Sequence, residues 1–251
     1  MNLDEATNLA RAFAERIRAI KAEYREFDWY PYDSFTNFDS FMHFTGPGRD
    51  LFNIIAPGTK IADIGAADGD TSFFFESLGA NVTIIENPQT NANDCRAILE
   101  LRARLRSKAS VQFIDLDWTP SIFGHYDIAV FLGILYHLRN PGLVLNALAH
   151  AASRLLLSTA VFTRLEDGTD VREQQLAYFV DRREMNNDPT NYWLFTPRAL
   201  RVLLRRSGWL VKDEFLVGES QTAIPAKRDC RMFCFCERIE NWRDLRLHHD
   251  F

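Results

Sequence analysis

This sequence of 251 residues has no long apolar run and no excess of positive charge. A membrane-spanning helix needs about 18 consecutive apolar residues, so we expect no membrane segment. The chain begins with a polar helical segment carrying Asp4 and Glu5, unlike a signal peptide, so we expect a cytoplasmic protein. Its 34 acidic residues outnumber its 29 basic ones and give a formal net charge of −5. Nucleic-acid binders usually show a basic face, so this balance disfavours a nucleic-acid partner without excluding one.

Cysteine is scarce, and the four cysteines are placed unfavourably for a metal site. Cys95 stands alone in a predicted helix, whereas Cys230, Cys234 and Cys236 fall in a predicted strand. Along a strand, Cys230 and Cys234 would lie about 13 Å apart at roughly 3.3 Å per residue. One zinc ion, with bonds of about 2.3 Å, cannot join them. We therefore expect core thiols and no bound metal.

A three-glycine dinucleotide motif is also missing, although one short loop comes close to it. The run Ile61–Ile64 is followed by Gly65-Ala66-Ala67-Asp68-Gly69, which predicts a buried strand, a tight loop and a helix start. Small side chains let a ligand approach such a loop closely. A dinucleotide loop has the spacing G-x-G-x-x-G, but here Ala67 and Asp70 replace two of the glycines.

Two acids in or beside this loop, Asp68 and Asp70, bear on the ligand. A carboxylate about 4 Å from a phosphate would cost roughly 4 kcal/mol at an effective dielectric near 20. Unless these acids point away, they disfavour a phosphate and favour a cationic group such as a sulfonium. An ordinary strand-to-helix turn of another α/β protein is the alternative.

Further elements follow the loop in regular order. A second strand, 82–86, ends in Glu86, which could accept hydrogen bonds from ribose hydroxyls or simply be a surface acid. Thr90 or Asn91 is predicted to cap a long helix that ends near Lys108. The remaining predictions are an N-terminal amphipathic helix over 9–24, strands at 111–115, 126–132 and 153–160, helices from 141 and over 197–206, and an antiparallel pair at 209–217 and 230–238.

The run D-x-G-x-A-x-G from Asp63 to Gly69 resembles the first motif of class I S-adenosylmethionine (SAM) dependent methyltransferases. With the following strands, the resemblance covers roughly residues 55–240. It implies an α/β fold, a Rossmann-like doubly wound seven-stranded sheet with an antiparallel last strand, and SAM as cofactor with S-adenosylhomocysteine as product. It divides the chain into an N-terminal helical and aromatic extension (1–50), a methyltransferase domain (51–240) with a lid insertion at about 163–195, and a tail (241–251).

The resemblance also implies which residues bind the cofactor. Asp63 would orient the loop near the methionine end, Glu86 would hold the ribose, and Asp115 would border the adenine. The full set of expected cofactor residues is Asp63, Gly65, Ala66, Ala67, Asp68, Gly69, Glu86, Asn87, Asp115, Leu116, Leu132, Gly133 and Tyr136.

A narrower resemblance concerns two runs, Gly133–Pro141 and Asn191–Leu200. Both runs look like the corresponding runs of the tRNA wobble-uridine (5-oxyacetic acid) carboxymethyltransferases. Those enzymes use carboxy-SAM and hold its extra carboxylate with cationic residues, including lysines before the first strand. The stretch from Glu26 to Thr59 has no lysine and one arginine, Arg49, which favours ordinary SAM. Arg228 or Arg231 could still supply a cation.

Tyr136 and His137 follow the fourth predicted strand and are the candidate catalytic residues. A histidine can act as general base toward a hydroxyl or phenol acceptor. Alternatively, both residues hold the loop and Tyr136 packs on the cofactor.

The acceptor is less well defined than the cofactor. The extension and the insertion are candidates to form its pocket, or they are structural additions. A small molecule is favoured over tRNA, although arginines cluster at 102–106 and 198–206 and could be a solvated helix face or an RNA patch. A non-catalytic SAM-binding module is a further possibility. The sequence does not indicate whether the protein is a monomer or an oligomer.

Overall fold

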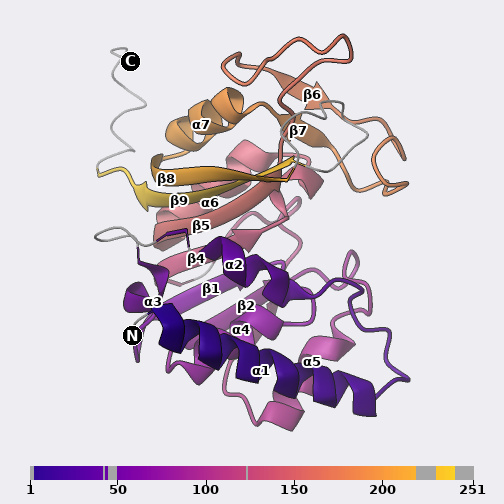
Figure 1. The fold of residues 1–251 in the computed structure, drawn as a ribbon, viewed down its shortest axis with the longest axis vertical. Helices are drawn as coiled ribbons and strands as arrows, with labels where there is room; N and C mark the ends of the chain where they lie inside the picture. Colours follow the sequence, from indigo (N-terminus) through magenta and orange to yellow (C-terminus); the bar gives the residue numbers. More distant parts are fainter. Residues whose placement is uncertain (1–2, 42, 45–49, 123, 219–229, 241–251) are drawn as a thin grey trace. The chain divides into compact units, whose positions relative to one another are not determined.

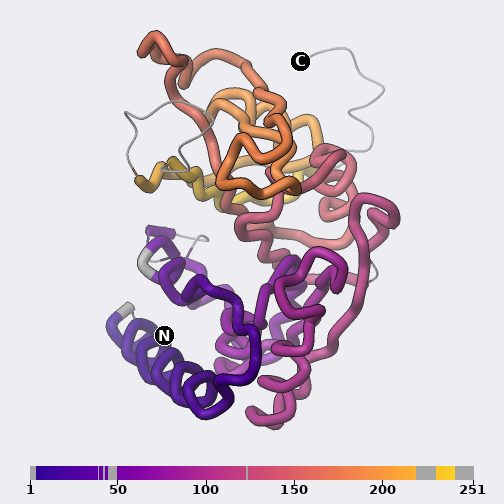
Figure 2. The backbone as a smooth tube through the Cα atoms, turned by 90° about the vertical axis from the view of Figure 1, so that its right-hand side faces the viewer, coloured from indigo at the N-terminus to yellow at the C-terminus, as the bar shows by residue number. Residues whose placement is uncertain are grey.

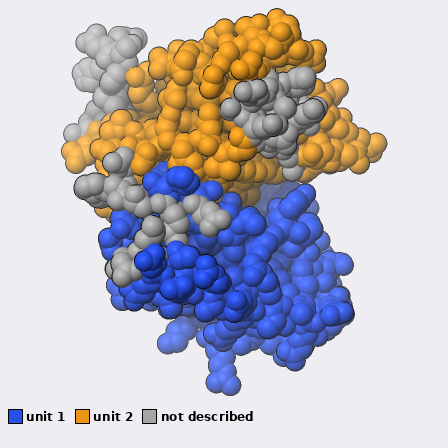
Figure 3. Space-filling view, in the orientation of Figure 1, with its two compact units in different colours: residues 1–115, 126–130 blue, residues 116–125, 131–251 orange. Residues whose placement is uncertain are grey.

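The computed structural model describes residues 3–41, 43–44, 50–122, 124–218 and 230–240 (Figure 1). The chain divides into two compact units (Figure 3). Unit 1 comprises Met1–Asp115 and Tyr126–Val130, and unit 2 comprises Leu116–His125 and Phe131–Phe251. The tail predicted at 241–251 lies outside the described residues.

Within the described residues, seven strands form one sheet in the order β3-β2-β1-β4-β5-β9-β8. Strand β2 pairs in parallel with β1 and β3, whereas β9 is antiparallel to both β5 and β8. This arrangement confirms the Rossmann-like α/β sheet with an antiparallel last strand. The strands are β1 (Lys60–Ile64), β2 (Asn81–Glu86), β3 (Ser110–Phe113), β4 (Tyr126–Leu132), β5 (Ala152–Ala160), β8 (Trp209–Gly218) and β9 (Cys230–Arg238).

Phenylalanines build much of the core of unit 1, whose chain can be followed from the N-terminus in Figure 2. The Phe74 ring centroid lies 5.6 Å from that of Phe13 and 4.8 Å from that of Phe38. The N-terminal extension therefore contributes core side chains, and these hold α1 and α2 against α4. The helices of this unit are α1 (Leu3–Glu23), η1 (Ser34–Asn37), α2 (Phe38–Phe41), α3 (Leu51–Ile54), α4 (Asp70–Ser77) and α5 (Arg96–Leu105).

The start predicted for α5 is wrong. The helix begins at Arg96, and neither Thr90 nor Asn91 caps it. The Asn91 carboxamide oxygen instead accepts hydrogen bonds from the backbone N–H groups of Asn93 and Cys95, and Cys95 has a φ of 62°. This left-handed conformation cannot continue a helix, and Arg106 (φ 53°) ends the helix in the same way.

Unit 2 contains helices α6 (Pro141–Ala151) and α7 (Pro197–Arg206), with η2 at Leu135–His137. As predicted, Thr196 caps α7, and its hydroxyl accepts a hydrogen bond from the Ala199 N–H. The predicted insertion contains a separate antiparallel ribbon, β6 (Ala177–Phe179) with β7 (Trp193–Phe195). Among the described residues, no helix is both long and apolar enough to cross a membrane.

Candidate functional site

The loop after β1 is shaped by left-handed residues. The φ angles of Gly65, Ala67 and Gly69 are 70°, 56° and 86°. The Gly65 N–H donates to Ile85 O at 2.9 Å, so the loop starts tied to β2. A Cβ atom added to Gly69 would lie 2.9 Å from the Phe73 ring, so glycine is needed there. The half-buried residues 65–67 leave small side chains at the loop surface.

Glu86 ends β2 directly beside this loop. Its Oε2 accepts a hydrogen bond from the Ala67 N–H at 2.9 Å, and its Oε1 accepts one from the Asn87 N–H at 3.0 Å. Burial raises the pKa of Glu86 to about 7, despite these two donors. Each carboxylate oxygen can accept more than one hydrogen bond, so Glu86 can bind the loop and a hydroxyl-bearing ligand together.

Asp63 lies in β1, just before the loop, and is fully enclosed. The Ser72 hydroxyl donates to its Oδ2. Burial raises the pKa of Asp63 to about 6, and the Ser72 hydrogen bond opposes that rise. Asp63 thus connects β1 to the first turn of α4.

The carboxylates of Asp68 and Asp70 have their partner within the protein. Lys21, from α1, places its Nζ 2.8 Å from Asp68 Oδ2 and 2.8 Å from Asp70 Oδ2. Lys21 offsets one of the two negative charges, so these acids cannot be counted as two unpaired carboxylates available to a cationic ligand. Asp68 remains a predicted cofactor residue only through its place in the loop.

Lys21 was not identified from the sequence, and it lies before the stretch from Glu26 to Thr59. Burial alone lowers the pKa of Lys21, but Asp70 and Asp68 outweigh that effect and raise it above its usual 10.5. A signal was present, since Lys21 follows the buried Ile17 of α1 by four residues, which is the spacing of the apolar side of the helix.

Two asparagines that the sequence did not single out brace the same loop. The Asn91 Nδ2 donates to Ala67 O at 3.0 Å. The Asn93 Nδ2 donates to Asp68 Oδ1 at 3.0 Å and to Asp28 O at 2.9 Å. Asn93 thereby links the loop to the N-terminal extension.

Unit 2 holds the residues predicted after β4. The Gly133 N–H donates to Ser158 O at 2.8 Å, and Gly133 has a φ of 76°. Tyr136 is buried in a cluster with Phe162, Leu194 and other apolar residues of the insertion. That environment fits the alternative that Tyr136 packs and holds the loop.

His137 is held by the insertion. Its Nδ1 lies 2.9 Å from Thr190 Oγ1, and that hydroxyl donates to Asp188 Oδ1 at 2.6 Å. The His137 Nδ1 is also 4.0 Å from Asp188 Oδ2. This chain of contacts orients the ring, which suits either a positioned base or a structural histidine.

Three further predicted residues are Asp115, Leu116 and Arg231. Asp115 ends the first segment of unit 1, and the buried Leu116 begins unit 2. Strand β3 ends at Phe113, so both residues follow it rather than belong to it. Arg231 lies on β9 with its guanidinium carbon 5.7 Å from the Tyr136 ring centroid, whereas Arg228 and Arg49 lie outside the described residues.

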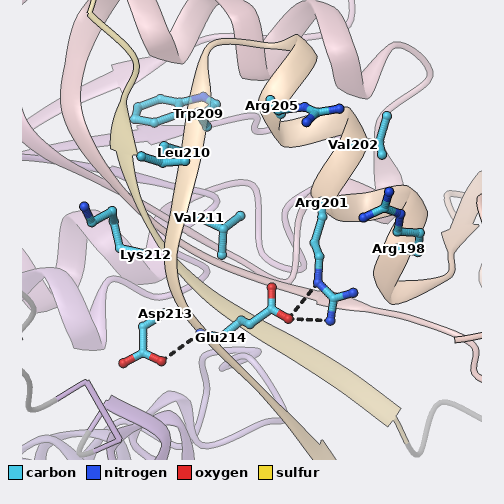
Figure 4. Close-up of a pocket in the computed structure, with 10 residues that line it drawn as sticks. All are labelled: Arg198, Arg201, Val202, Arg205, Trp209, Leu210, Val211, Lys212, Asp213 and Glu214. Atoms are coloured by element: carbon cyan, nitrogen blue, oxygen red, sulfur yellow. Dashed lines mark hydrogen bonds and ion pairs between the residues drawn. The ribbon is translucent and has the colours of Figure 1, made fainter. Parts of the chain in front are cut away.

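A surface pocket of about 370 Å³ lies between α7 and β8 (Figure 4). No predicted site residue lines it. Arg201, one of the clustered arginines, places its Nη2 2.5 Å from Glu214 Oε1. The pairing reduces the positive charge that this helix face offers to an RNA phosphate.

No protein-family model and no curated protein matches the chain. Its structure is similar to the N-terminal domain of EvdMO1 with S-adenosylhomocysteine bound (TM-score 0.55, 14% identity, 89% of this chain and 97% of that one covered). It is also similar to a SAM-dependent methyltransferase from Methanosarcina mazei (0.53, 16%, 75% and 96%) and to the glycopeptide N-methyltransferase MtfA complexed with SAM (0.50, 15%, 78% and 91%). The chain therefore has the fold of SAM-dependent methyltransferases.

Proposed function

We propose that this protein is a SAM-dependent methyltransferase that acts on a small molecule. The observation that carries the proposal is the pairing of Glu86 with the loop after β1. A buried carboxylate at the end of β2 accepts the Ala67 N–H, and residues 65–67 present only small side chains beside it. This combination suits the ribose and methionine portions of SAM, and the solved structures with this fold include SAM and S-adenosylhomocysteine complexes.

Of the predicted cofactor residues, the loop, Glu86, Asn87 and Asp115 belong to unit 1. Leu116, Leu132, Gly133 and Tyr136 belong to unit 2. When bound, SAM supplies an activated methyl group, so the protein mainly has to position the acceptor. His137, oriented by Thr190 and Asp188, would accept the proton of a hydroxyl or phenol acceptor.

A second candidate is a tRNA wobble-uridine methyl- or carboxymethyltransferase. It is supported by the runs Gly133–Pro141 and Asn191–Leu200. The net charge of −5 weighs against it. Carboxy-SAM is disfavoured too, because Lys21 is already bound by Asp68 and Asp70.

Calorimetric titration with S-adenosylhomocysteine tests the cofactor assignment. Glu86→Ala should weaken binding by roughly 10- to 100-fold, since each hydrogen bond to a charged group contributes on the order of 1.5–3 kcal/mol. Glu15→Ala, an exposed change on α1, is the control and should bind like the wild type. Equal affinity of Glu86→Ala and wild type would refute the ribose assignment.

Transfer of labelled methyl groups from SAM tests the reaction. The wild-type protein is incubated with separate tRNA and metabolite pools. Label in the metabolite pool is the expected result, whereas label in tRNA would establish the second candidate. Binding of S-adenosylhomocysteine without transfer to either pool would indicate a non-catalytic SAM-binding module.

A further inference from the structure

One face of the β6–β7 ribbon, whose two strands are labelled in Figure 1, carries aromatic side chains. Side chains alternate along a strand, so directly paired residues share a face. The pair Tyr178 and Leu194 packs against the buried cluster around Tyr136. The pair Phe179 and Trp193 lies on the opposite face, with ring centroids 4.9 Å apart and Phe179 62% exposed. A solvent-facing side normally carries polar residues, so these rings need another explanation.

Other residues of unit 2 extend this aromatic face. Trp118 is 75% exposed, and the Arg139 guanidinium carbon lies 6.0 Å from its ring centroid and 5.7 Å from that of Tyr192. The Arg139 Nε donates to the Tyr192 hydroxyl at 3.1 Å, and the Trp193 Nε1 donates to Arg139 O at 3.3 Å. We call Trp118, Arg139, Phe179, Tyr192 and Trp193 the aromatic patch.

The charge of the patch limits what it can bind. Its cation, Arg139, faces Asp117, which accepts the Arg139 backbone N–H at 2.8 Å and places Oδ2 4.0 Å from the Arg139 Nε. Binding a nucleic-acid backbone requires several cations at the contact surface. A single arginine matched by an acid suits an uncharged ring system, which can stack on aromatic faces and on a guanidinium.

The patch is attached to the segment that carries His137. The Tyr192 N–H donates to Tyr136 O at 2.8 Å, and Arg139 follows His137 by two residues. Thr190, whose hydroxyl lies 2.9 Å from the His137 Nδ1, precedes Tyr192 by two residues. Because these backbone segments are linked, we expect a molecule stacked on the patch to lie near the candidate base.

We propose that the aromatic patch docks the methyl acceptor, and that the acceptor is a small molecule bearing an uncharged ring that stacks on aromatic side chains. This inference rests on the proposed methyltransferase function. The stacking face can be the π face of an aromatic ring or the C–H groups on one side of a sugar ring, since both pack on indole and phenyl groups.

Fluorescence titration tests this assignment with two probes, 2-naphthol and methyl β-D-glucopyranoside, each added to protein saturated with S-adenosylhomocysteine. One of the probes should bind the wild type, and Trp118→Ala and Phe179→Ser should each weaken its binding at least 10-fold. Both changes affect exposed side chains, so folding should be retained. Tyr32→Ala, which removes a ring 64% exposed in unit 1, is the control and should bind as the wild type does.

The outcomes separate this inference from the proposed function, because S-adenosylhomocysteine affinity is measured on the same samples. If S-adenosylhomocysteine binds but neither probe does, or if the variants bind the probe normally, the patch is not the acceptor site. Loss of affinity for a single-stranded RNA oligonucleotide in the same variants would overturn the inference in favour of nucleic acid. A wild-type dimer that Trp118→Ala makes monomeric would assign the patch to a second copy of the chain.

Discussion

Lys21 shows how one side chain from the N-terminal extension completes a loop more than 40 residues away. Its ammonium group is largely enclosed and contacts two carboxylates that are almost fully buried. Removing one partner of a buried ion pair leaves an uncompensated charge, which costs far more than losing an exposed pair. Lys21 therefore stabilises the loop and the attachment of α1 together.

Lys21→Met should lower the free energy of unfolding by about 3–5 kcal/mol, because Asp68 and Asp70 lose their counter-charge. Urea denaturation measures the change. Arg18→Met on the same helix is the matched control: its ion pair with Asp33 is largely exposed, so the loss should stay below about 1 kcal/mol. Similar losses in the two variants would show that the Lys21 contacts contribute little. Adding Asp70→Asn to Lys21→Met should recover part of the stability.

At the scale of elements, local signals were reliable where they matched the tertiary contacts. Thr196 and Pro197 predicted the start of α7, and the structure has the Thr196 hydroxyl as its cap. Asn91 carries an equally good local capping signal, but its side chain is used in the turn before α5 and against Ala67 O. Capping residues thus predicted one helix start and misplaced another, because the same side chain can satisfy different backbone groups.

Thr196→Val should destabilise the protein by about 2–4 kcal/mol. The fully buried hydroxyl caps α7, donates to Gln174 O and accepts from the Leu176 N–H, so an isosteric methyl group leaves these polar groups unsatisfied. Thermal unfolding measures the loss. Thr36→Val, which removes an exposed hydroxyl, should change stability by less than about 0.5 kcal/mol. A Thr196→Val loss as small as that control would show that water or a shifted backbone replaces the hydroxyl.

For the whole molecule, buried acids make stability depend on pH. Burial raises the pKa of Glu86 from 4.5 to about 7, so the folded state binds this proton more tightly than the unfolded chain. The protonated Glu86 contributes fully to stability below about pH 4.5, and this contribution is lost as the pH rises through about 7.

Relative to Glu86→Gln, the wild-type protein should therefore lose stability between pH 5 and pH 8, by on the order of 1–3 kcal/mol. Urea titrations of both proteins at several pH values measure this difference. Asp170→Asn is the control: its hydrogen bond to Arg172 lowers the pKa of Asp170 to about 2, so its difference from wild type should stay constant over this range. A constant difference for Glu86→Gln as well would contradict the raised pKa.

The pattern of apolar runs and turns was enough to predict the strands of the main sheet and most helices, because each of these depends on residues close in sequence. The arrangement of those strands in one sheet was predicted from the resemblance to methyltransferases. The loop from Gly65 to Gly69 and the acid at Glu86 were predicted on the same basis. Contacts between distant residues decided the rest. Nothing in the sequence indicates that Asp68 and Asp70 share a partner, and only folding brings Lys21 of α1 against both carboxylates. The aromatic patch likewise forms only because folding brings Trp118, Arg139 and the β6–β7 ribbon together. These residues are far apart in sequence, so no local sequence pattern predicts their contacts.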